Sequence, residues 1–116
     1  MRIESWIGVD LDGTLAEYHG WKGIEHIGKP IEAMVARVQM WLQDGMDVKI
    51  FTARVCQAQD GKTVEEIVTI IQDWCEEHIG FRLEVTNVKD FGMIDLWDDR
   101  CTSVRLNSGE IRRYEG

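Results

Sequence analysis

Four aspartates in two short clusters are the residues of this chain best suited to chemistry. Asp10 and Asp12 are separated by one residue in the stretch IGVDLDGT, and Asp98 and Asp99 are adjacent in the stretch LWDDR. Carboxylates this close repel each other, so local stability does not explain them. Mg²⁺ favours hard oxygen ligands and is commonly bound by one or two carboxylates together with a phosphate oxygen. The two clusters therefore predict a magnesium site that binds a phosphorylated substrate.

The segments that would position these aspartates alternate between strand and helix patterns. A helical apolar period follows Pro30 and stops before Gly45, and a capping box of Thr63 and Glu66 opens a second helix that ends at Gly80. Such alternation predicts an α/β fold, namely a Rossmann-like three-layer sandwich whose mainly parallel central sheet is covered on both faces. The expected strands are residues 5–9, 48–51, 83–86 and 93–97, with a terminal hairpin or strand pair at 104–106 and 110–113.

Polar residues gather at the ends of these expected strands. Because the carboxyl ends of parallel strands share one edge, where ligands bind in such sheets, we expect these side chains to converge there. A residual strand period would send the side chains of Asp10 and Asp12 the same way, and Gly13 would let the backbone approach a ligand. The residues at or after strand ends are Asp10, Asp12, Thr52, Lys89, Asp98 and Asp99.

The composition is that of one ordinary globular domain. We expect a single domain over residues 1–116, with a flap-like loop at about 13–29. The formal net charge of −8 makes nucleic acid an unfavourable partner. No apolar run approaches a membrane span, and the N-terminal residues are typical of a strand rather than a signal peptide. The three cysteines, Cys56, Cys75 and Cys101, indicate reduced, small apolar residues of a cytoplasmic protein.

Three motifs in order resemble those of a known superfamily. DLDGT, FTAR and LWDDR are similar to motifs one, two and four of the haloacid dehalogenase-like (HAD) phosphohydrolases, and NVKD supplies a lysine at a plausible place for motif three. The resemblance extends from Val9 to Arg100, and the spacing is most similar to short members found in bacteria and phages. It implies a HAD-like fold without a cap domain.

The resemblance implies a Mg²⁺-dependent phosphatase that hydrolyses a phosphomonoester through an aspartyl-phosphate. Asp10 would be the nucleophile, and Asp12 would be the general acid and then the general base. Asp98 would bind Mg²⁺ directly, Asp99 would bind it or orient its water, and the backbone carbonyl of Asp12 would also reach the metal.

Other residues would hold the phosphoryl group. The resemblance assigns Thr52 to a phosphoryl oxygen and Lys89 to neutralising the phosphoryl charge. Lys62 is a second candidate for the motif-three lysine, because Lys89 is followed by aspartate where the short relatives often have proline. Arg54 and Arg100 lie just past expected site residues and could contact substrate phosphate, or could pair with Asp98, Asp99 or helix-terminal carbonyls. Gly13 completes the expected substrate contacts.

Two alternatives belong to other classes of protein. A phosphoacceptor signalling domain of the receiver type is disfavoured, because the middle strands end in Thr52 and in Thr86-Asn87, without the aspartate it needs. A non-catalytic or accessory protein that keeps the metal site stays open. Trp21 in the flap either contacts substrate or packs the flap onto the body. An open site without a cap suits a large substrate or a neighbouring subunit as cover, so an oligomer is possible.

Overall fold

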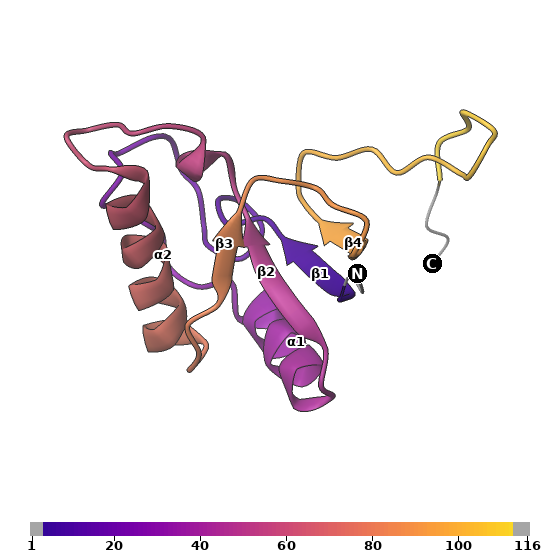
Figure 1. The fold of residues 1–116 in the computed structure, drawn as a ribbon, viewed down its shortest axis with the longest axis horizontal. Helices are drawn as coiled ribbons and strands as arrows, with labels where there is room; N and C mark the ends of the chain where they lie inside the picture. The colour runs from indigo at the N-terminus through magenta and orange to yellow at the C-terminus, as the bar shows by residue number, and fades with distance from the viewer. Residues whose placement is uncertain (1–3, 113–116) are drawn as a thin grey trace.

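Four short strands form one parallel sheet in the computed structural model, which describes residues 4–112 (Figure 1). The order across the sheet is β3-β2-β1-β4, and every neighbouring pair is parallel. The predicted α/β class with a parallel sheet is therefore confirmed. The strands are β1 (Trp6–Val9), β2 (Asp47–Phe51), β3 (Glu84–Thr86) and β4 (Met93–Trp97).

Two helices and a short 3₁₀ turn connect the first three strands. α1 (Glu32–Gln43) follows β1, and η1 (Ala53–Val55) and α2 (Val64–His78) follow β2. The predicted capping box opens α2: Thr63 Oγ1 accepts from the N–H of Glu66, and the Glu66 carboxylate accepts from the N–H of Thr63. Gly45 ends the turn after α1 with a φ of 81°. Local signals thus determine where both helices begin or end.

Both helices pack on one face of the sheet. Alternate strand residues, such as Ile7 and Val9, belong to a single core with buried residues of α1 and α2. The chain moves in one direction from β1 to β2 to β3. Because parallel crossovers are right-handed, two successive crossovers in the same direction place their helices on the same face.

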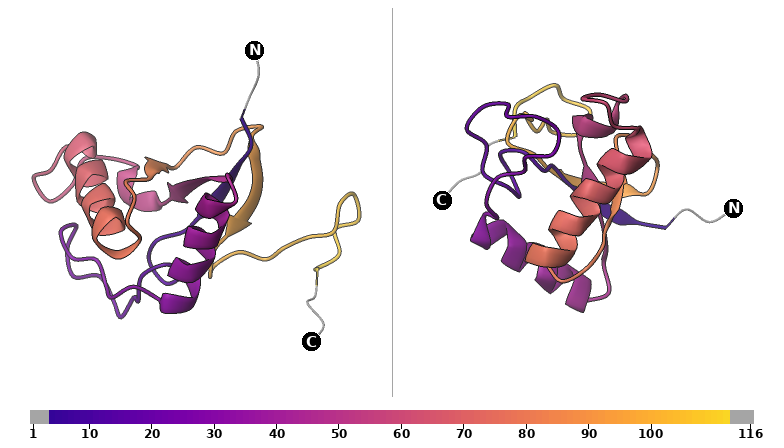
Figure 2. Two further views of the ribbon diagram at one scale, coloured as in Figure 1. Left: turned by 90° about the horizontal axis from the view of Figure 1, so that it is seen from below. Right: turned by 90° about the vertical axis from the view of Figure 1, so that its left-hand side faces the viewer.

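The second face is covered by the connection between β3 and β4 instead of the expected helical layer. Residues 87–92 cross this face, on the side of the strands away from α1 (Figure 2). The buried Trp6 donates its indole N–H to Asp90 in this connection at 2.8 Å. The Nζ atom of Lys49 lies over the Trp6 ring, 4.6 Å from its centroid. The third layer of the predicted sandwich is thus a loop among the described residues.

The flap and the C-terminal hairpin are two of the segments that lie outside the sheet and helices. The flap, residues 13–29, folds back on itself through a hydrogen bond from the N–H of Glu17 to the carbonyl of Lys29 at 2.8 Å. At the other end of the chain, an antiparallel bridge joins Val104 and Ile111, in agreement with the predicted hairpin, whose Arg113 lies outside the described residues. This hairpin extends away from the sheet (Figure 1).

Within residues 4–112, no helix combines the length and the apolar character that a membrane crossing requires. The three cysteines are free thiols, as predicted. Only Cys75 is a buried core residue, and burial raises the pKa of its thiol to about 12. Cys56 and Cys101 are exposed, so the prediction of small apolar packing residues holds for one of the three.

Candidate functional site

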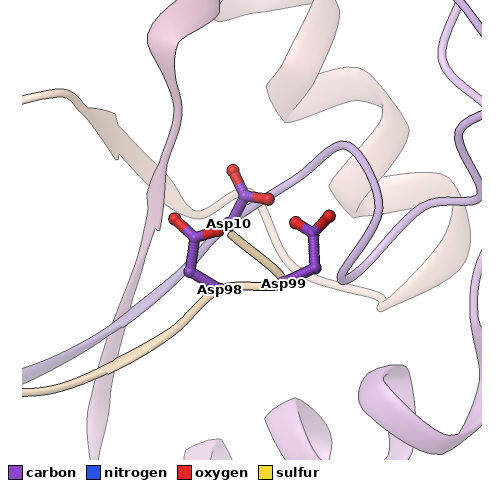
Figure 3. Close-up of side chains that lie close together, drawn as sticks. All are labelled: Asp10, Asp98 and Asp99. Atoms are coloured by element: carbon purple, nitrogen blue, oxygen red, sulfur yellow. The ribbon is translucent and has the colours of Figure 1, made fainter. Parts of the chain in front are cut away.

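Three carboxylates from two strand ends form an acidic cluster. Asp10, Asp98 and Asp99 each place one oxygen within 4.8 Å of the others (Figure 3). The cluster forms because β1 and β4 are neighbours whose last residues pair, and the N–H of Asp10 then donates to the carbonyl of Trp97 at 2.9 Å. The sequence predicted that these residues converge, and the structure brings them together.

Thr14 ties the two strand ends at this cluster. Its hydroxyl oxygen lies 3.3 Å from Asp10 Oδ2 and 3.2 Å from Asp99 Oδ1, and it accepts from the N–H of Asp99 at 3.0 Å. A hydroxyl has one hydrogen, so it serves one carboxylate at a time. Thr14 stands in the DLDGT motif, but no role was predicted for it.

A glycine is required at position 13, where the turn after β1 approaches the turn after β4. Its φ is 90°, and a Cβ built there would lie 2.7 Å from Oδ2 of Asp99. Any other residue would therefore displace Asp99 and strain the backbone. The glycine was predicted to let backbone approach a ligand; the structure shows it allowing the close approach of an acidic side chain.

The pKa of Asp10 reflects its burial among other carboxylates. Burial, the negative charge of Asp98 and a hydrogen bond to Asp99 that only protonated Asp10 can donate together raise the pKa of Asp10 to about 7. A carboxyl held this far above its ordinary value is destabilised when ionised. A bound cation would relieve this penalty. The oxygen-only donor set fits a hard divalent cation such as Mg²⁺, although it does not single that ion out.

Asp12 turns away from this cluster, contrary to the expectation of a shared direction. Both of its carboxylate oxygens accept from Arg54, at 2.7 Å from Nε and 2.8 Å from Nη2. The cause is local: β1 ends at Val9, and Leu11 begins a tight turn in which its carbonyl accepts from Leu15. The two-residue strand period therefore no longer applies at Asp12.

Arg54 joins Asp12 to the flap. Its guanidinium also donates to the carbonyl of Ile24 at 3.0 Å and to that of His26 at 2.9 Å, and the ring of Trp21 lies over it at 4.9 Å. Four of its five N–H groups are thus used within the protein, and the residue is only 6% exposed. The structure supports pairing with a carboxylate rather than substrate binding, but the partner is Asp12 and not the expected Asp98 or Asp99.

Thr52 follows β2 and is buried at the same edge of the sheet. Its hydroxyl oxygen accepts from the N–H of Arg54 at 3.2 Å, while its own N–H donates to the carbonyl of Thr86 on β3. A hydroxyl that accepts in this way keeps its own O–H for donation. This arrangement suits the predicted contact with a phosphoryl oxygen.

Neither candidate lysine borders the cleft that contains the acidic cluster. Lys89 is exposed in the connection that crosses the second face, and Lys62 lies near Glu25 of the flap at 3.6 Å. Among the described residues, the cations that line this cleft are Arg54 and Arg100. Arg100 directly follows the second aspartate pair, and its N–H donates to Asp98. The motif-three assignment to either lysine stays a prediction.

The cleft has a volume of about 680 Å³ and collects most of the predicted site residues. Gly13 and Lys89 are not part of its lining. It also contains Tyr18, for which no role was assigned, and Arg100, which was expected either to contact substrate phosphate or to pair with a carboxylate or a helix-terminal carbonyl. The predicted residues that line the cleft are Asp10, Asp12, Thr52, Arg54, Asp98 and Asp99.

Comparison with known proteins supports the fold. The chain matches no protein-family model and no curated protein. Its structure is similar to a solved structure described as a conserved protein from Bacteroides thetaiotaomicron, with a TM-score of 0.59 and 19% sequence identity. The match covers 85% of this chain and 78% of that chain. At this identity the likeness bears on the α/β fold alone.

Proposed function

We propose that this protein is a Mg²⁺-dependent phosphomonoesterase of the HAD-like type. The observation that carries the proposal is the convergence of Asp10, Asp98 and Asp99 in one cleft with Asp12 and Thr52. The motif resemblance assigns roles to all five residues. Their roles are nucleophile for Asp10, metal binding for Asp98 and Asp99, general acid and base for Asp12, and phosphoryl contact for Thr52. Without a bound cation, such an acidic cleft would repel a phosphate dianion.

The cation would be held by the carboxylates of Asp10 and Asp98, with Asp99 as a third ligand or as the partner of a bound water. When bound, it would neutralise charge on the phosphoryl oxygens and on the acidic cluster. Thr14 would keep Asp10 and Asp99 oriented toward this position, because its hydroxyl lies within 3.3 Å of both.

In the first chemical step, a carboxylate oxygen of Asp10 attacks phosphorus. The bond between phosphorus and the leaving oxygen breaks, and Asp12 gives that oxygen a proton. The products are an aspartyl-phosphate on Asp10 and a neutral alcohol. Thr52 donates its O–H to a phosphoryl oxygen, and Arg100 supplies the positive charge that the lysines, outside the cleft, do not.

In the second step, Asp12 takes a proton from water as the water oxygen attacks phosphorus. The acyl phosphate bond breaks, which releases phosphate and regenerates the carboxylate of Asp10. Before either step, Asp12 must free at least one carboxylate oxygen from Arg54, because both oxygens accept hydrogen bonds from that guanidinium. Substrate binding would have to accompany a side-chain rotation of Asp12.

The test is phosphate release from p-nitrophenyl phosphate with Mg²⁺ or with EDTA, for the wild type and for Asp10→Asn. We expect turnover that requires the metal and is lost in the variant. Asp47→Asn is a matched control, because Asp47 is an exposed aspartate at the start of β2, at the opposite end of that strand from the site. Turnover that survives Asp10→Asn would overturn the nucleophile assignment.

One observation favours a second function, that of an accessory metal-binding protein. The bidentate pair of Asp12 and Arg54 occupies the residue that turnover requires as an acid. Such a protein would bind Mg²⁺ through the acidic cluster but release no phosphate from any phosphomonoester. Metal-induced thermal stabilisation without turnover, across a panel of phosphomonoesters, would support this second function over the first.

A further inference from the structure

Two cavities meet beside the acid–base residue. The larger cleft contains the acidic cluster, and a second cavity of about 330 Å³ is formed largely by the flap. The second is near the lower end of the range for small-molecule sites, roughly 300–1,000 Å³. A substrate with its phosphoryl group over Asp10 would extend its leaving group across the border between them. The residues that line both cavities are Asp12, Tyr18, Trp21 and Arg54.

Trp21 is an aromatic surface held in place at this border. Its ring lies 4.9 Å from the guanidinium carbon of Arg54, which is itself buried and fixed by hydrogen bonds to Asp12 and to two flap carbonyls. The residue is nevertheless 49% exposed, so the indole contacts the protein on the Arg54 side and remains accessible elsewhere. An aromatic ring supported in this way can stack against a second flat ring without ordering a mobile side chain.

The polar groups around this ring favour a heteroaromatic partner. The flap cavity is lined by the hydrogen-bonding side chains of His19, Lys22, His26 and Lys29. The lining of this cavity has more basic than acidic side chains, although the net charge of the whole chain is −8. The basic residues are Lys22, Lys29 and Arg54, and the acidic residues are Asp12 and Glu17. A plain hydrocarbon would not use these donors, whereas a heteroaromatic ring uses both the donors and the flat surface of the indole.

We propose that the substrate is a nucleoside monophosphate whose base stacks on Trp21. The inference rests on the proposed phosphomonoesterase activity and gives it a substrate class. The phosphate lies over Asp10, the sugar passes Asp12, and the base lies at the border of the two cavities, with its ring nitrogens and oxygens toward the flap. Trp21 then determines specificity without taking part in the chemical steps.

The experiment compares AMP and UMP with ribose 5-phosphate, which has the same sugar and phosphate as these nucleotides but no base. We expect the wild type to favour the nucleotides by at least about tenfold in kcat/KM, because stacking of a base on an aromatic side chain is a substantial interaction. Trp21→Ala should lower the nucleotide value to that of ribose 5-phosphate and change the latter less than about twofold. Trp21→Phe should retain most of the preference.

Phe81→Ala is the matched control, because Phe81 is an exposed aromatic residue between α2 and β3 that lines neither cavity. It should leave both substrates unchanged. Equal kcat/KM for AMP and ribose 5-phosphate in the wild type would overturn the proposal. An equal loss for both substrates in Trp21→Ala would also overturn it, since that result assigns Trp21 to packing of the flap.

Binding separates this inference from the proposed activity. Calorimetry with the Asp12→Asn variant, which is expected to turn over slowly but to keep its response to Mg²⁺, measures the binding of AMP and ribose 5-phosphate in the presence of the metal. Tighter binding of AMP that is lost in Asp12→Asn/Trp21→Ala supports a nucleotide site even if no phosphomonoester is hydrolysed. Indistinguishable binding of the two ligands would reject the nucleotide while leaving the phosphomonoesterase proposal intact.

Discussion

The two acidic turns of this protein look alike in sequence but are used differently in the structure. After β4, the adjacent Asp98 and Asp99 both point toward Asp10. After β1, Asp10 joins that cluster while Asp12, two residues later, pairs with Arg54 instead. Proximity in sequence therefore does not decide which carboxylates share a site.

The partner available to each side chain explains the difference. Asp99 is drawn to Asp10 by Thr14, whose hydroxyl contacts both, and Gly13 leaves room for its carboxylate. Asp12 faces a buried guanidinium fixed by flap carbonyls. The same side-chain type thus stands in a cluster of like charges in one place and in an ion pair in the other. Separate roles as metal ligand and acid–base residue would follow from this difference.

Neutralising one carboxylate of the first turn at a time tests whether Asp10 and Asp12 have different roles, and it should give the largest effect. Asp12→Asn should lower turnover by about 10²–10⁴-fold, the usual contribution of a general acid–base, while Mg²⁺ still raises the melting temperature. Asp10→Asn should lose both turnover and the metal-induced shift. Activity assays and thermal melts with and without Mg²⁺ measure these effects. Equal loss of metal response in the two variants would remove the distinction.

Removing the guanidinium of Arg54 tests whether this residue holds Asp12 in place. Arg54→Ala should destabilise the protein by about 3–5 kcal/mol in urea unfolding, because it leaves a carboxylate and two flap carbonyls without their donor. Arg82→Ala is the control: its pairs with Asp73 at 2.6 Å and with Glu76 at 3.1 Å are exposed, so its loss should destabilise the protein much less. Similar costs for the two variants would show that the buried pair is not an anchor.

A third experiment tests whether Arg100, which follows the second acidic turn, binds the phosphoryl group. Arg100→Ala should lower kcat/KM by about tenfold or more, since a charged hydrogen bond to a phosphoryl oxygen is worth about 1.5–3 kcal/mol. Lys89→Ala and Lys62→Ala should each change it less than about twofold, because neither side chain lines the cleft. A large loss in Lys89→Ala would instead support the lysine that the motif resemblance suggests.

Metal-free protein should also show a pH dependence of stability that originates at Asp10. The pKa of Asp10 is raised from 3.8 to about 7, so between these values the folded state binds more protons than the unfolded state. Stability therefore falls as pH rises through this range. Asp10→Asn removes this loss, so in EDTA the variant should gain in melting temperature relative to the wild type as pH rises from about 4 to 8. A constant difference across this range would contradict the crowding of the cluster.

Much of the fold could be predicted because its signals are local. The capping box of Thr63 and Glu66, the glycine after α1 and the apolar strand segments depend on neighbours a few residues apart. The placement of polar residues at strand ends then predicted the edge where the cleft lies. The covering of the second face could not be predicted in this way, because a connection of six residues, 87–92, carries no periodicity that reveals its path across the sheet.

The sequence by itself determined the parallel α/β class, the helix boundaries and the set of carboxylates that meet at one edge, because these depend on periodicity and on the shared direction of parallel strands. Only the tertiary structure decided that Asp12 pairs with Arg54 across 42 positions, that Thr14 joins Asp99 across 85, and that Lys89 lies away from the cleft. These contacts depend on the strand order β3-β2-β1-β4 and on how the flap packs. Residues distant in sequence acquire their partners only when the sheet and the flap assemble.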